Sequence, residues 1–430
     1  MSFYSHSAQM LFYRFISIAI GTTIAILLAR LLGPADRGVL AMLVLSISLA
    51  SLFLQFGFPE TIIYIVGSKV FPNDQVTSTI IVYFLIIIAL FSIPASYCMN
   101  WYWHFSTQKN ILLVLATSVS ILLTTMRHFL LARQQFRGYG LSILLENIIY
   151  LFGILVIWGF FSVSVDNALI AYVLSMSLAF TLILVLQLRN GFSISLKHIR
   201  PQIITKCFQH GYHLFIAGIG GFGAQRINYY ILESLVGMRA VGLFVAAGTI
   251  PTLFANLPQQ LGTVIYSHVA NSESNDQGTK VTLKVFKVVA LLSAFCMLPV
   301  AVFSKEIVTV FFGKEFSDIH RVLVILSIGM TFIGLSGILY NALAGIGLHK
   351  FGSRMAFVNI FLISALAFLL VPTLGVEGAA LAQMVAAFVN LLYMLWIYSR
   401  QFRLSIKSLL FLSKAEWSLL LRPFAKIVSL

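Results

Sequence analysis

Charged and polar residues inside apolar segments are the positions at which this sequence could do chemistry. Arg14, Glu146 and Arg226 lie within long apolar runs, where an ionised side chain is costly and usually faces a protein interior or a water-filled cavity. Arg226 is followed by Asn228 and Tyr229, which add an amide and a phenol to the cation. These three neighbours favour a substrate-binding role in a cavity. Arg14 lies near the start of its run, so it either joins that site or extends its side chain to the membrane surface.

Two acidic residues are candidates for coupling transport to an ion. Glu146, beside Asn147, could exchange a proton, and the alternative is a structural ion pair with an arginine. Glu60 follows Pro59 at the end of an apolar run, so it is either a gate residue or a solvated glutamate. We predict Glu146 and Glu60 as the ion-coupling residues, with H⁺ and Na⁺ both open as the coupling ion.

A basic cluster ends the fourth apolar run, where Arg127 and Arg133 lie near His128 and Arg137. The arginine fork matches the oxygens of a phosphate. Arg127 and Arg133 are therefore predicted to contact a phosphate-bearing substrate at the cytoplasmic mouth of the protein. The alternative is that these cations only mark a cytoplasmic loop.

Several other kinds of chemistry are absent from the sequence. The three cysteines are widely separated, and no spacing of Cys or His suggests a metal site. The glycine-rich run 218–223 lies in an apolar segment and follows no strand, so it fails the context of a nucleotide-binding loop. It is better explained by close helix packing or a flexible break. We predict a protein without metal or cofactor, and a transporter rather than an enzyme.

The elements that position these residues are membrane-spanning helices. The chain is 60% hydrophobic and 10% charged, whereas about a quarter of the residues of a soluble domain are charged. Apolar runs of roughly 20 residues, enough to cross a bilayer, recur from end to end. The first run is predicted to be a retained span, because it lacks the pattern of a cleaved signal peptide. The sequence predicts an all-α membrane protein with about twelve spans, at 8–30, 38–58, 76–98, 110–131, 141–161, 167–188, 212–235, 241–267, 283–304, 322–344, 354–372 and 378–398.

The charges are divided unequally between the two sets of loops. If the N-terminus is cytoplasmic, the inner loops and the C-terminal tail carry nearly all of the net charge of +15, and the charges of the outer loops cancel. The positive-inside rule then places both termini in the cytoplasm and the chain in the bacterial inner membrane. This topology explains the basic composition without nucleic acid as a partner.

A weak internal repeat divides the spans into two groups of six. Leu32-Gly33 and Arg37-Gly38 recur as Val236-Gly237 and Val241-Gly242, and Leu131-Ala132, Gly140 and Asn147 recur with the same spacing as Leu343-Ala344, Gly352 and Asn359. We predict two six-helix lobes related by a pseudo-twofold axis along the membrane normal, with substrate between them. The predicted parts are an N-terminal lobe at 1–190, a cytoplasmic linker at 191–211, a C-terminal lobe at 212–399, and a basic amphipathic tail at 400–430 that contacts membrane lipids or is partly disordered.

One local motif resembles a known family. The run Leu28-Ala29-Arg30-Leu31-Leu32-Gly33-Pro34-Ala35-Asp36-Arg37-Gly38, followed by an apolar span, is similar to the N-terminal signature of Wzx-type polysaccharide flippases. These belong to the MOP exporter superfamily, together with the MATE exporters and the lipid II flippase. The resemblance implies ion-coupled alternating access, as in an antiporter, that moves a polyprenyl-diphosphate-linked oligosaccharide to the outer leaflet for O-antigen, capsule or exopolysaccharide synthesis. It also implies a polysaccharide polymerase and a chain-length regulator as partners, and a cationic cavity that Arg226 and Arg14 could supply.

Two alternatives follow from the same features. A MATE-like multidrug exporter prefers organic cations and would want acidic cavity residues, whereas the clear intramembrane charges here are two arginines and one glutamate, Arg14, Arg226 and Glu146. A membrane polysaccharide polymerase or ligase resembles this chain in its many spans, but it has a large extracytoplasmic loop that no segment here provides. We therefore favour the flippase over both.

Overall fold

The computed structural model describes residues 3–103, 107–189, 195–270, 275–348 and 350–405. Within these ranges the secondary structure is helical throughout, which confirms the predicted all-α class. The chain forms two units, Met1–Phe222 and Gly223–Leu430. The predicted tail 400–430 lies mostly outside the described residues, and the four-part division of the chain stays a prediction.

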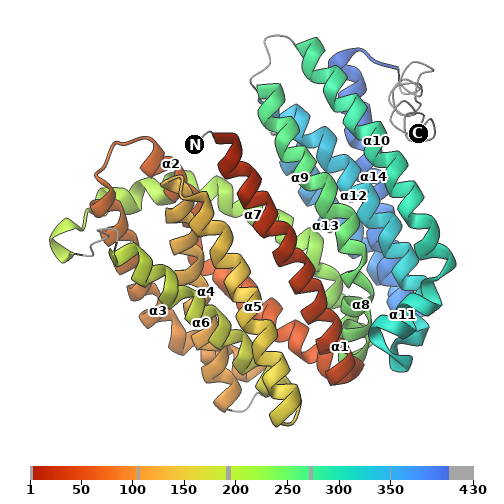
Figure 1. Ribbon diagram of the computed structural model, residues 1–430, viewed down its shortest axis with the longest axis horizontal. Coiled ribbons are helices and arrows are strands. Elements are labelled where there is room, and N and C mark those ends of the chain that lie inside the picture. Colours follow the sequence, from red (N-terminus) through yellow and green to blue (C-terminus); the bar gives the residue numbers. More distant parts are fainter. Residues whose placement is uncertain (1–2, 104–106, 190–194, 271–274, 349, 406–430) are drawn as a thin grey trace, which may run out of the picture. The chain divides into compact units, whose positions relative to one another are not determined.

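Unit 1 is a bundle in which α1 packs against α4, α5 and α6 (Figure 1). Its elements are α1 (Phe3–Gln55), α2 (Phe58–Gly67), α3 (Asn73–Trp103), α4 (Thr107–Ala132), α5 (Phe136–Phe160), α6 (Val165–Arg189), the short 3-10 helix η1 (Leu196–His198) and the first part of α7 (Pro201–Leu235).

Unit 2 is a second bundle, in which α12 packs against α9, α10 and α14. Its elements after α7 are α8 (Met238–Thr249), α9 (Pro251–Ala270), α10 (Asn275–Val302), α11 (Ser304–Phe312), the 3-10 helix η2 (Lys314–Ile319), α12 (His320–Gly345), α13 (Lys350–Leu374) and α14 (Val376–Phe402).

The apolar helices account for most of the predicted spans. Within the described ranges, nine helices are long and apolar enough to cross a membrane, and the α8–α9 pair, bent by 49°, makes a tenth if it is one span. The apolar part of α1 has 44 residues. At 1.5 Å per residue it is about 66 Å long, roughly twice the hydrocarbon thickness. Every predicted span except 212–235 falls in one of these helices. That segment lies in α7, which is long but less apolar.

Glycine permits the sharp turn in α1 that joins the first two predicted spans. Gly33 has φ 73° and ψ 174°, a conformation that a side chain strongly disfavours. Pro34 follows it at the start of the next helical segment, where a missing N–H costs nothing. Gly237, the predicted repeat of Gly33, has φ 109° and ψ 177° directly before α8. The repeated glycines therefore make the same kind of turn in both units.

An ion pair is repeated as well. Lys109 Nζ lies 3.2 Å from Asp166 Oδ1, which joins the starts of α4 and α6 in unit 1. Arg321 Nη1 lies 4.0 Å from Glu377 Oε1, which joins the starts of α12 and α14 in unit 2. The two pairs occupy corresponding helices, and they add to the sequence matches that suggested a duplication.

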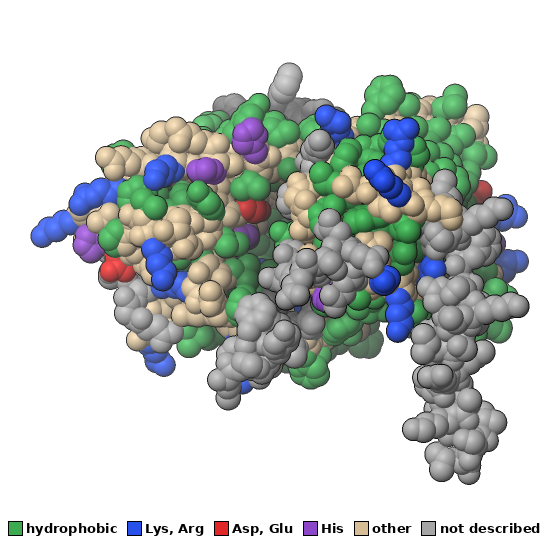
Figure 2. Space-filling view, turned by 90° about the horizontal axis from the view of Figure 1, so that it is seen from above, with side chains coloured by type: hydrophobic (Ala, Val, Ile, Leu, Met, Phe, Trp, Pro, Cys, Tyr) green, Lys and Arg blue, Asp and Glu red, His purple; other side chains and the backbone are tan. Residues whose placement is uncertain are grey.

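Large apolar side chains cover the outsides of the bundles. Phe152 on α5 and Phe361 on α13 are 67% and 76% exposed, and many leucines on neighbouring helices are similarly exposed. Such a surface is expected to contact lipid. Figure 2 shows a face on which, over unit 1, Lys and Arg side chains are spread among apolar ones and acidic side chains are few.

Candidate functional site

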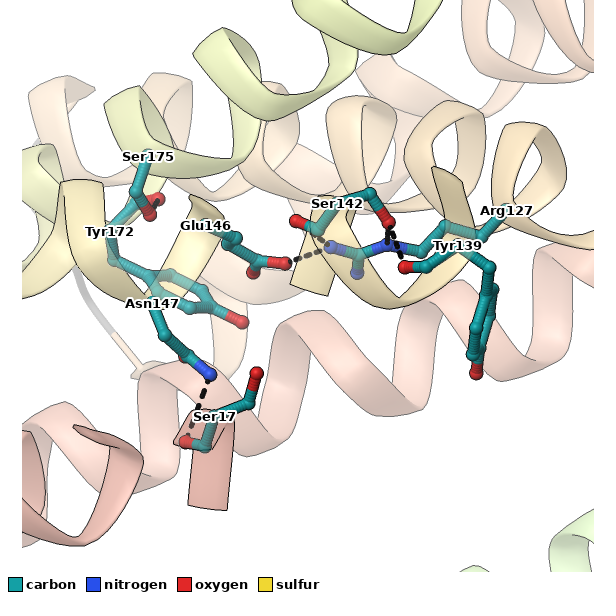
Figure 3. A network of polar contacts seen from close by, with 8 residues as sticks. All are labelled: Ser17, Arg127, Tyr139, Ser142, Glu146, Asn147, Tyr172 and Ser175. Carbon is teal, nitrogen blue, oxygen red and sulfur yellow. Dashed lines mark hydrogen bonds and ion pairs between the residues drawn. The ribbon is translucent and has the colours of Figure 1, made fainter. Parts of the chain in front are cut away.

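The interior of unit 1 contains a charged pair. Arg127 Nη2 on α4 donates to Glu146 Oε2 on α5 at 2.5 Å (Figure 3). Both side chains are mostly buried, with 15% and 17% of their surface exposed. A charge pair in such surroundings is strongly attractive, because little water screens it. Of the two interpretations of Glu146, the structure therefore shows the ion pair, and its ion-coupling role stays a prediction.

Ser142 fixes the guanidinium in this pair. Arg127 Nε donates to Ser142 Oγ at 3.1 Å, and Nη2 donates to the Ser142 carbonyl oxygen at 3.0 Å. The Ser142 hydroxyl gives its own hydrogen to the Tyr139 carbonyl at 2.7 Å, so its lone pairs accept from Arg127. Ser142 lies one turn before Glu146 and thus on the same face of α5.

A second group of polar side chains adjoins Glu146. Asn147 Nδ2 donates to the Ser17 carbonyl on α1 at 3.2 Å. In the part of the chain that the structure describes, the buried Ser17 hydroxyl has no hydrogen-bond partner. Tyr172 on α6 lies close enough to Glu146 for an electrostatic interaction, and Figure 3 shows its ring beside Glu146 and Asn147. We call Ser17, Arg127, Ser142, Glu146, Asn147 and Tyr172 the unit 1 polar centre.

The sequence indicated only part of this centre. Glu146, Asn147 and Arg127 stood out as polar residues in or near apolar runs. Ser17, Ser142 and Tyr172 come from three helices and carry no local pattern, because small hydroxyls are common in membrane helices. The spacing of Ser142 and Glu146 was the available signal, since residues four apart share a helix face.

Arg133 has different partners from Arg127. Its Nη1 donates to Gln187 Oε1 and its Nη2 to Thr77 Oγ1, each at 3.2 Å. Burial lowers the pKa of the Arg133 guanidinium, and nearby Asp74 acts in the opposite direction. These hydrogen-bond partners differ from those of Arg127, and the predicted phosphate contact of the two arginines stays a prediction.

Arg226 and Tyr229 form the cationic part of α7 in unit 2. Arg226 Nη1 donates to the Tyr229 hydroxyl at 2.7 Å, and the guanidinium carbon lies 5.2 Å from the ring centre. Tyr229 in turn packs edge-on against Phe244, with ring centres 5.8 Å apart. In the part of the chain that the structure describes, no carboxylate lies within ion-pair distance of Arg226. The half-buried cation is thus held by a neutral phenol.

Asn228 takes part in packing within unit 2. Its Nδ2 donates to the Ala379 carbonyl at 3.3 Å and to Gln383 Oε1 at 3.4 Å, both on α14. The Asn228 side chain is buried, and its Oδ1 has no hydrogen-bond partner among the described residues. Asn228 therefore ties α7 to α14, and no described hydrogen bond joins its side chain to Arg226 or Tyr229.

Arg14 and Glu60 are exposed residues of unit 1. Glu60 lies in the first turn of α2, where the helix dipole favours a negative charge. Neither residue has a described hydrogen bond to the unit 1 polar centre. Among the described residues, no three His, Cys, Asp or Glu side chains group as a metal site would require.

Comparison with known proteins identifies the family. A family described as polysaccharide biosynthesis protein matches residues 27–321. The chain belongs to this family. A capsular polysaccharide biosynthesis protein, CapF of Staphylococcus aureus, is 28% identical over 61% of this chain and 67% of its own length. A putative O-antigen transporter of Shigella flexneri is 22% identical over 58% of this chain and 59% of its own length.

Solved structures show the same fold. The lipid II flippase MurJ in an inward closed conformation has a TM-score of 0.74 and 17% identity, covering 93% of this chain and 88% of its own. An inward-facing multidrug MATE transporter of the MOP superfamily has a TM-score of 0.72 and 16% identity, covering 90% and 96%. The predicted resemblance to the fold of the MOP superfamily is thus confirmed. The chain is a multi-pass membrane protein with a transporter fold.

Proposed function

We propose that this protein is a flippase that moves a polyprenyl-diphosphate-linked oligosaccharide from the cytoplasmic to the outer leaflet of the inner membrane. Family membership supports a role in polysaccharide synthesis, and the fold is that of transporters that include a lipid flippase. The single observation that carries the proposal is Arg226, a half-buried cation of a membrane helix without a described carboxylate partner. A diphosphate is the counter-anion that such a cation would attract.

The proposed topology has twelve spans. The long α1 supplies two of them because it turns at Gly33, and the bent α8–α9 pair supplies one. The second part of α7 supplies the remaining span, 212–235. Its hydropathy is modest because Arg226 and a glycine-rich segment lower the apolar content there. With an even number of spans, both termini are cytoplasmic, as the distribution of Lys and Arg favours.

We further propose the unit 1 polar centre as the coupling site. Protonation of Glu146 would remove the negative charge that holds Arg127, while Ser142 would still bind the guanidinium. Either a proton or Na⁺ would compete with the Arg127 guanidinium for the Glu146 carboxylate, so both stay open as the coupling ion. Proton exchange at Glu146 would therefore change the contact between α4 and α5.

A MATE-like exporter of organic cations is the second candidate, because the fold is equally compatible with it. The charges in the described spans favour an anionic substrate instead. A polymerase or ligase is disfavoured by the connections that we assign to the outer side, which are short at Gly33, at 161–164 and at Gly375.

Deletion of the gene tests the proposal. We expect the mutant strain to accumulate the lipid-linked oligosaccharide on the cytoplasmic leaflet and to lose surface polysaccharide. Plasmid-borne wild-type protein should restore the polysaccharide, Arg226→Ala should not, and Arg226→Lys should restore it in part. Normal surface polysaccharide in a deletion strain without a redundant flippase would contradict the proposal.

A further inference from the structure

The boundary between the two units falls inside a helix. Helix α7 runs without interruption from Pro201 to Leu235, yet unit 1 ends at Phe222 and unit 2 begins at Gly223. The boundary coincides with the end of the glycine-rich run Gly218-Ile219-Gly220-Gly221-Phe222-Gly223. Any change in the relation of the two units must therefore be absorbed either in this run or in the polar segment before α7.

The segment before α7 is anchored to unit 1. The Ser195 backbone N–H donates to Ser78 Oγ at 3.1 Å, and the Arg200 backbone N–H donates to Thr79 Oγ1 at 2.9 Å. Ser78 and Thr79 are fully buried near the start of α3. Hydrogen bonds from a backbone to buried hydroxyls hold a chain in place, because breaking them leaves unpaired groups. Residues 195–200 are thus fixed to α3 and are poorly suited to act as the joint.

The first part of α7 is anchored as well. A Cβ on Gly211 would lie 2.7 Å from the Phe56 carbonyl oxygen, so the α7 backbone touches the corner between α1 and α2. Phe215 stacks on Phe56 with ring centres 4.5 Å apart, and Phe208 packs edge-on against Phe58 at 5.0 Å. These contacts hold α7 on unit 1 up to Phe215.

The glycine-rich run lacks such restraints at its centre. A Cβ on Gly221 would have no neighbouring atom within 4 Å. Glycine weakens a helix because its backbone has more freedom in the unfolded state and no side chain restricts bending. The run is held at both ends, because a Cβ on Gly218 would lie 3.2 Å from Leu52 of unit 1 and one on Gly223 would lie 2.9 Å from Ile360 of unit 2. The open position Gly221 lies between these two contacts, next to the unit boundary at Phe222.

We infer that residues 218–223 of α7 are the flexible joint between the two units, and that the polar segment 195–200 is a fixed part of unit 1. The inference rests on the proposed alternating-access transport but not on the identity of the substrate. It concerns a joint formed by a bending helix, where the sequence suggested a loop at 191–211.

The test replaces Gly221 by Ala and by Leu in the full-length protein. Both residues favour a straight helix, and the Cβ that each adds at Gly221 has no neighbouring atom within 4 Å. Gly21→Ala in α1 is the matched control, because a Cβ there also has no neighbour within 4 Å. Spin labels at Phe161→Cys in unit 1 and Leu374→Cys in unit 2, in a background without the native cysteines, report the distance between the units in nanodiscs.

We expect a broad distribution of label distances in the parent protein and a narrower one in Gly221→Ala, narrowing further in Gly221→Leu. Transport should fall about threefold or more, and Gly21→Ala should match the parent in both readouts. An unchanged distribution in both Gly221 variants would overturn the inference. So would a broader distribution in Ser78→Ala/Thr79→Ala with no effect at Gly221, which would place the joint before α7. The distances are measured without substrate, so they would still test the joint if the protein proved not to be a flippase.

Discussion

The two units share a scaffold and differ in where they carry charge. Both have a glycine turn, at Gly33 and Gly237, and an ion pair at the starts of corresponding helices. Among the described residues, the mostly buried Arg127–Glu146 pair has no counterpart in unit 2. With the spacing of the sequence repeat, Leu339 and Val358 occupy the corresponding positions there, whereas Arg226 corresponds to Arg14 of unit 1. We therefore propose that the shared turns and ion pairs serve folding and that the unshared Arg127–Glu146 pair serves coupling.

The largest expected effect comes from giving unit 1 the apolar residues of unit 2. Arg127→Leu alone leaves the Glu146 carboxylate buried without its cation, which should cost roughly 3–5 kcal/mol of stability. The double variant Arg127→Leu/Glu146→Val should recover most of that loss, because no buried charge remains. Denaturation in detergent measures the free energy of unfolding of the single and double variants. A double variant as unstable as the sum of the single variants would show that the pair does not act as a unit.

The same double variant separates folding from coupling. We expect it to be folded but to transport without dependence on a proton gradient, or not at all. If this variant still transported in response to a proton gradient, the unit 1 polar centre would not be the coupling site.

The shared glycine turns should give the next largest effect. Gly33→Ala and Gly237→Ala force a side chain into a conformation that is nearly confined to glycine, at a cost of about 1–3 kcal/mol each. The free energy of unfolding in detergent measures this cost, with Gly21→Ala as the helical control. Similar losses of unfolding free energy in the two variants would support the duplication. A loss in only one variant would show that Gly33 and Gly237 are not equivalent.

The cation of unit 2 should affect transport more than stability. Arg226→Ala is expected to slow flipping of the lipid-linked oligosaccharide about tenfold or more, which corresponds to about 1.4 kcal/mol. Arg321→Ala, which removes an exposed arginine of the same unit, is the matched control. Equal rates for the two variants in reconstituted vesicles would argue against Arg226 as a substrate contact.

The Lys109–Asp166 and Arg321–Glu377 ion pairs should give the smallest effects. Surface pairs contribute about 0.2–1 kcal/mol, so Lys109→Ala and Arg321→Ala should lower the melting temperature slightly. The effect should be larger for Lys109, because its pair is shorter and less exposed. A larger loss of melting temperature in Arg321→Ala than in Lys109→Ala would show that distance and exposure do not determine how much each pair contributes to stability.

Much of the fold could be predicted from the sequence, because apolar length and the distribution of charge are local properties. Every predicted span except 212–235 falls in an apolar helix of the structure, and the repeated glycines turned out to make matching turns. The short helices α2 and α11 were missed, since their ten and nine residues fall below the length that a membrane search detects.

The candidate site was less predictable, because partners on different helices leave no pattern in the chain. The sequence offered an arginine as partner for Glu146, but it did not select Arg127, which seemed equally suited to a phosphate. Ser17 and Tyr172 approach Glu146 only through the packing of α1 and α6 on α5. The continuous helix through residues 218–223 agrees with the predicted span 212–235, although the glycines also left a flexible break open.

Transport in reconstituted vesicles tests the central claim most directly. Purified protein would be placed in vesicles that contain a polyprenyl-diphosphate-linked oligosaccharide from the native host, with an imposed pH gradient. We predict that the oligosaccharide reaches the opposite leaflet in vesicles with wild-type protein, about tenfold more slowly with Arg226→Ala, and without dependence on the gradient, or not at all, in Arg127→Leu/Glu146→Val. No movement of the lipid-linked oligosaccharide, together with uptake of an organic cation by the same vesicles, would contradict the proposed function.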